Sequence, residues 1–247
     1  MRGLLLHDYY CMKPQITLFI RVILITFIIG LLLLLGMKHG NFKDLVADND
    51  EAFEMLIMTF NIFIPFICGL IPFFLVQWKL TGDKKSGWDK YYFSLPVSDK
   101  AKLAATYAAT AISVVITFII TMSITMIFNR IAYPDDAGID SLQLSFGVYF
   151  FAVTLSYVLI AAHCIIRNKV KLTILFFTTL IVGQITLSYL LLYSDGIMDI
   201  YMKVIDFIEW ICTHHLYAVA LFAVLIGMLS YCVSLFTIKK RREKLCK

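Results

Sequence analysis

The chain has 247 residues, of which 60% are hydrophobic and only 16% are charged, and its mean hydropathy is +0.83. This composition excludes an ordinary water-soluble domain and predicts an all-α polytopic membrane protein. The net charge of +5 is unevenly spread along the chain, so it points to membrane topology and anionic lipid rather than to nucleic acid.

Six apolar runs follow one another along the sequence, and each is long enough to cross about 30 Å of hydrocarbon as a helix. No soluble stretch is large enough to form a core of its own, so we expect one transmembrane domain over residues 1–247. The six runs lie near 16–36, 52–78, 103–128, 143–166, 172–193 and 216–238.

Basic residues predict the orientation of these spans. Seventeen of the 22 Lys and Arg fall in the N-terminus, residues 79–102, residues 167–171 and the C-terminal tail. The opposite loops hold four, and Arg21 lies inside the first run, where it can snorkel to the inner headgroups. By the positive-inside rule, we expect a protein of the cell membrane with both termini on the cytoplasmic side.

The first 15 residues mix leucines and tyrosines with charged groups, which predicts an amphipathic helix on the inner membrane surface. A loose N-terminus is the alternative. A second amphipathic stripe over Ile197–Thr213, inside the loop 194–215, predicts an external helix. The tail 239–247 is a basic cytoplasmic anchor for anionic lipid.

Polar and helix-breaking residues interrupt the apolar spans. Pro65, Gly69 and Pro72 predict a kinked second span that can act as a hinge. Asn61 and Gln184 lie inside spans and need partners, so we take them as tentative residues of a substrate path. A stripe of threonines and Ser113 in the third span fits either a polar path or helix packing, and packing is favoured. Its residues are Thr106, Thr110, Ser113, Thr117 and Thr121.

The cytoplasmic loop 79–100 carries a short aromatic helix, Trp88–Leu95. Its apolar residues recur at helical spacing, Ser86 can cap its start, and Pro96 ends it. Ser98 is then a plausible N-cap of the third span. An aromatic helix between two spans indicates a docking element.

Enzymatic motifs are missing. Residues 82–87 begin like a phosphate-binding loop, but Trp88 and Asp89 stand where Lys and Ser or Thr are required. The His163–Cys164 and His214–His215 pairs have no further ligands at suitable spacing, so we expect no metal site and no catalytic residue. The six cysteines show no disulfide framework.

These features resemble the permease subunits of ABC-2-type exporters. The local likeness lies in Met1–Tyr10 and in Gly87–Tyr91 followed by Ser94–Ser98. His7 and Asp99 depart from that pattern, because the family usually has a basic residue at both places. In overall layout the chain looks most like the exporters of cytolytic peptides, the phenol-soluble modulins.

The resemblance implies roles for several residues. The segment 1–15 would be an interface helix, and Trp88–Leu95 would be a coupling helix seated on a separate ABC ATPase subunit. The interface residues would include Arg2, Leu5, Asp8 and Tyr9. The docking residues would be Trp88, Asp89, Tyr91, Tyr92, Leu95 and Pro96.

The resulting hypothesis is an exporter permease that binds no cofactor itself and uses ATP and Mg through its partner ATPase. A second permease subunit completes the dimer, and the cargo is an amphipathic peptide. Drug or lipid-linked cargo, or a non-transporting immunity or scaffold protein, are the alternatives.

Overall fold

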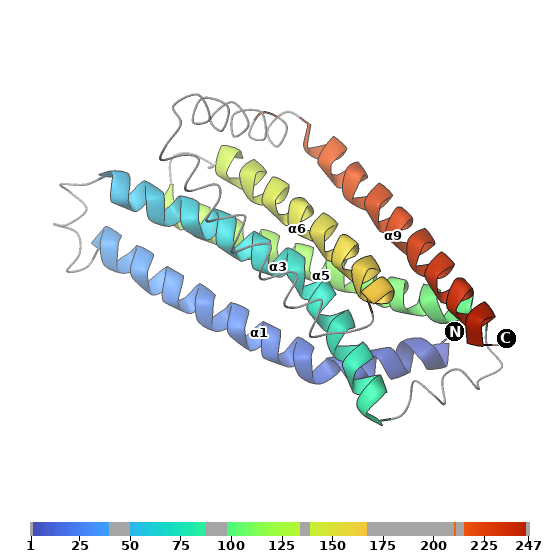
Figure 1. The fold of residues 1–247 in the computed structure, drawn as a ribbon. Helices are drawn as coiled ribbons and strands as arrows, with labels where there is room; N and C mark the ends of the chain where they lie inside the picture. The colour runs from blue at the N-terminus through green and yellow to red at the C-terminus, as the bar shows by residue number, and fades with distance from the viewer. Residues whose placement is uncertain are drawn as a thin grey trace, which may run out of the picture.

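The computed structural model describes residues 2–39, 50–86, 98–133, 139–166, 210 and 215–245. Within these ranges the chain forms five long helices (Figure 1). They are α1 (Arg2–His39), α3 (Asp50–Ser86), α5 (Asp99–Ala132), α6 (Ile139–Ile166) and α9 (Leu216–Leu245).

All five helices are long and apolar enough to cross a membrane. Their candidate spans confirm five of the six predicted runs, while the predicted span 172–193 lies outside the described residues. The five spans are Leu6–Gly36, Ile57–Asp83, Lys100–Ala132, Leu142–Ile166 and Leu216–Lys239.

The spans extend beyond the predicted boundaries on the side of the basic loop. Lys79 and Lys102, assigned to that loop from sequence, both lie within helices and are buried. Ser86 is the last residue of α3, and its hydroxyl donates to the carbonyls of Gly82 and Asp83. Ser86 thus belongs to α3, and the aromatic helix that it was expected to begin lies outside the described residues.

The expected interface helix and first span form one continuous helix, α1. Pro14 lies inside α1, and the N-terminal part of the helix stands at an angle to the rest (Figure 1). A proline removes one backbone hydrogen bond and crowds the preceding turn, so we attribute the bend to Pro14. One face of this segment is exposed and apolar, with Leu6, Tyr9 and Tyr10 more than half exposed.

Helix α3 is the centre of the fold and packs on α1, α5 and α6. At Gly69 a Cβ atom would lie 2.6 Å from Ala152 Cβ of α6, so glycine permits the close approach of the two helices. Pro65 leaves the carbonyl of Asn61 without its helical donor. The Ser145 hydroxyl of α6 donates to that carbonyl at 2.9 Å.

A second serine of α6 makes the same kind of contact nearer the other proline. Ser156 Oγ donates to the Gly69 carbonyl at 2.7 Å. Pro65 and Pro72 are both fully buried. The predicted kink region is therefore packed tightly against α6, and the hinge role of Pro65, Gly69 and Pro72 stays a prediction.

Helix α5 begins as the sequence predicts, with Ser98 as its N-cap accepting from the Ala101 N–H at 3.3 Å. Its threonine stripe is buried, and the hydroxyls donate to carbonyls one turn back in α5. Thr117 also contacts the Tyr149 hydroxyl of α6 at 2.9 Å. The stripe thus serves helix packing, the favoured alternative.

Helix α9 packs on α6 and α5. The Tyr107 hydroxyl of α5 lies 2.7 Å from Ser230 Oγ and 3.0 Å from Ser234 Oγ of α9. In Figure 1, α6 and α9 run in the same direction and end on the side where both termini lie. Four described cysteines form no disulfide, namely Cys11, Cys68, Cys164 and Cys232.

Candidate functional site

A buried ion pair joins the N-terminal segment of α1 to the last third of α3. Lys79 Nζ donates to Asp8 Oδ2 at 2.6 Å and to Thr106 Oγ1 of α5 at 2.8 Å. The exposed fractions of Asp8 and Lys79 are only 0% and 2%. A charge buried this far from water destabilises the fold unless it is paired with an opposite charge. Because Lys79 contacts both Asp8 and Thr106, it links α1, α3 and α5 at one point.

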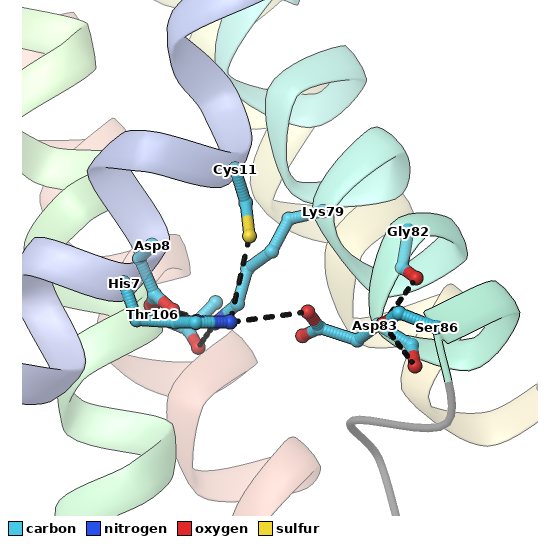
Figure 2. Close-up of polar contacts among 8 residues, drawn as sticks. All are labelled: His7, Asp8, Cys11, Lys79, Gly82, Asp83, Ser86 and Thr106. Atoms are coloured by element: carbon cyan, nitrogen blue, oxygen red, sulfur yellow. Dashed lines mark hydrogen bonds and ion pairs between the residues drawn. The ribbon is translucent and has the colours of Figure 1, made fainter.

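A second set of polar groups lies beside this pair (Figure 2). His7 Nδ1 is 3.3 Å from Asp8 Oδ1, while His7 Nε2 faces Cys11 Sγ at 3.5 Å and Asp83 Oδ1 at 3.8 Å. His7 and Cys11 are four residues apart, which places both on one face of α1. We call the six residues of both sets the polar knot: His7, Asp8, Cys11, Lys79, Asp83 and Thr106.

The polar knot lies next to the loop 87–97. Lys79 and Asp83 lie in the last two turns of α3, and Thr106 lies two turns after the start of α5. These two helices flank residues 87–97, which contain the expected docking helix. The N-terminal segment is thus bonded to the helix that enters that loop, and Lys79 of the same helix is bonded to the helix that leaves it.

Several of the predicted site residues cannot be placed. The docking residues Trp88–Pro96 and the path residue Gln184 lie outside the described residues, and the side chains of Arg2 and Leu5 are not described. Tyr9 is described and is half-exposed.

The remaining predicted residues are buried. Asp8 lies within the polar knot. Asn61 is 3% exposed, and its Nδ2 donates to Asn129 Oδ1 of α5 at 2.9 Å. This contact favours a structural role for Asn61 in the present conformation, and its place in a substrate path stays a prediction.

Sequence reasoning missed most of the polar knot. The sequence places Lys79 in a loop, gives Cys11 and Asp83 no part in a site, and assigns Thr106 only to the threonine stripe of the third span. One signal was available: an acidic residue in an apolar N-terminal segment and a lysine at the end of an apolar span both need partners. The pairing itself was not visible, because Asp8 and Lys79 are 71 residues apart.

Comparison with known proteins decides the family. The family model described as ABC-2 family transporter protein matches residues 52–239. The chain belongs to the ABC-2 family of transporters. The match covers α3 to α9 and includes the loop 87–97, whereas the N-terminal segment precedes it. Searches of curated proteins and of solved structures found no significant match.

Membership identifies this chain as the membrane component of an ABC transporter. It is a membrane transport subunit, and the family implies a partner ATPase that supplies ATP hydrolysis. The five apolar helices agree with a multi-pass membrane subunit.

Proposed function

We propose that this permease exports amphipathic peptides out of the cell, as a dimer driven by two separate ATPase subunits. The observation that carries the energy-coupling part of the proposal is the polar knot. Lys79 of α3 bonds both the N-terminal segment and α5, so the two helices that flank the loop 87–97 are joined to each other and to α1. A movement of that loop is therefore passed to three helices at once.

The proposal includes a sixth span at 172–193. Helices α6 and α9 run in the same direction (Figure 1), which supports one further crossing in the sequence between them. Six crossings put both termini on one side. The excess of Lys and Arg in the terminal segments supports a cytoplasmic location for that side.

Energy enters, in this proposal, through the helix Trp88–Leu95 when the ATPases bind ATP and close. The Lys79 contacts carry the movement to α1 and α5, while Ser145 and Ser156 hold α6 against α3. Because α3 and α6 are bonded at two levels, they move as a pair. Cargo then passes between the two subunits along the second and fifth spans.

The proposal goes furthest in naming the cargo as a peptide. It is supported by the predicted amphipathic external helix at Ile197–Thr213, which suits a two-faced peptide, and by the likeness in layout to phenol-soluble modulin exporters. A direct measurement is the ATP-dependent release of a labelled amphipathic helical peptide from cells that express the permease and its ATPase. Retention of the peptide despite active ATPase would exclude this cargo.

The docking helix is tested by co-purification. The double substitution Trp88→Ala and Tyr91→Ala removes two large apolar side chains from the expected contact. We expect association with the ATPase, and stimulation of its turnover, to be lost. A matched control replaces one Trp and one Tyr that are exposed near the start of α9, Trp210→Ala with Tyr217→Ala. Unchanged association in the first double variant would refute the docking role.

A further inference from the structure

We propose that His7, Cys11 and Asp83 form a binding site for Zn²⁺ that connects the N-terminal segment of α1 to the end of α3. Their potential ligand atoms, one imidazole nitrogen, one thiol sulfur and one carboxylate oxygen, all lie within 4.8 Å of one another. Nitrogen, sulfur and oxygen from these three residue types are the usual zinc ligands in proteins. Metal binding by these three residues can be measured whatever the cargo is and without the ATPase.

The distances suit one tetrahedral ion. Zinc bonds of about 2.3 Å to sulfur and about 2.0 Å to nitrogen or oxygen set ligand-to-ligand separations of roughly 3.3–3.6 Å. Cys11 Sγ and His7 Nε2 are 3.5 Å apart, and His7 Nε2 and Asp83 Oδ1 are 3.8 Å apart. The third pair, Cys11 Sγ and an Asp83 carboxylate oxygen, lies within 4.8 Å. The side chains therefore have to close further around one ion, and water takes the fourth position.

The residue next to His7 supplies the usual outer partner of a zinc-bound histidine. His7 Nδ1 lies 3.3 Å from Asp8 Oδ1, so the carboxylate can accept a hydrogen bond from Nδ1–H. That hydrogen bond leaves the lone pair on Nε2, the nitrogen that faces Cys11 and Asp83 (Figure 2). In known zinc sites, a carboxylate that bonds the second ring nitrogen of a histidine ligand orients the ring and raises its basicity.

Charge and access also favour a divalent ion. Binding releases the Cys11 thiol proton to water, and the resulting thiolate and the Asp83 carboxylate together balance two positive charges. Lys79 is already paired with Asp8 at 2.6 Å, which reduces its repulsion of the ion. The His7 side chain is 23% exposed, so the ion can reach the site from solvent.

The consequence is a metal clamp within the coupling region. Two ligands come from α1 and one comes from the last turn of α3, close to the loop 87–97. Bound Zn²⁺ would hold the N-terminal segment against α3. Hydrogen exchange in residues 2–15 should therefore slow when Zn²⁺ is added to the purified full chain.

The first experiment titrates the full chain in detergent with Co²⁺, a spectroscopic substitute for Zn²⁺, and then with Zn²⁺. We expect one equivalent of Co²⁺ to produce a sulfur-to-cobalt charge-transfer band, and Zn²⁺ to remove it by competition. This measurement needs no variant. Absence of the band in the unmodified chain would overturn the proposal.

Variants then assign the ligands. His7→Gln and Cys11→Ser keep size and polarity, and each should weaken Zn²⁺ binding more than about 100-fold, since loss of an outer partner alone weakens it about 10–100-fold. Cys232→Ser, which removes an exposed thiol of α9, should bind as the unmodified chain does. Undiminished binding by Cys11→Ser, or an equal loss in Cys232→Ser, would overturn the assignment.

Discussion

The buried pair of Lys79 and Asp8 makes a quantitative prediction about stability. Lys79→Met keeps most of the side-chain length but removes the cation, and it leaves the Asp8 carboxylate buried without its 2.6 Å partner. Removing one partner of a buried ion pair typically costs about 3–5 kcal/mol in free energy of unfolding. For a chain of this size that loss corresponds to roughly 6–20 °C in Tm.

The assay heats the purified protein and measures the fraction that still elutes as a monodisperse species. Lys100→Met is the matched control, because Lys100 is an exposed lysine near the start of the same helix as Thr106. The double variant Lys79→Met with Asp8→Asn removes both charges and should recover most of the loss. Two results would contradict this reasoning. The first is that Lys79→Met lowers Tm no more than Lys100→Met does. The second is that the double variant loses as much Tm as the two single variants added together, which would mean that the two charges do not interact.

Two further predictions concern the contact between α3 and α6. Gly69→Ala should lower Tm, because its Cβ would meet an α6 side chain at 2.6 Å, whereas Gly82→Ala has nothing within 4 Å and should leave Tm unchanged or raise it. Ser145→Ala leaves the proline-freed carbonyl of Asn61 without its donor and should cost about 1–3 kcal/mol, measured by the same assay. Ser123→Ala removes only a hydroxyl bonded within its own exposed stretch of helix, and a loss as large as that of Ser145→Ala would contradict this reasoning.

Much of the architecture was predictable from the sequence, because it depends on local properties. Length and hydropathy locate the membrane helices, and five of the six predicted runs are long helices in the structure. Ser98 identified the start of α5, since a capping residue acts on backbone groups only three residues away. Pro65 likewise lies where α3 accepts a donor from another helix, because its ring frees the Asn61 carbonyl that Ser145 bonds.

The partners of these residues depended on tertiary structure. Periodicity indicates which residues share a face, but it does not say which other helix packs on that face. Ser145 satisfies Asn61, and Asn129 bonds the Asn61 side chain, from positions 84 and 68 residues away. A lysine at the end of an apolar run reads as the start of a basic loop unless its acidic partner is known.

The polar knot shows this division most clearly. The sequence by itself determined that His7 and Cys11 share a helical face and that Asp8 stands in an apolar segment. Only the packing of α1 on α3 and α5 brought Lys79, Asp83 and Thr106 to that face. The reason is physical: burying a charge costs free energy that only a nearby partner offsets, and that partner can come from any helix that the fold places beside it.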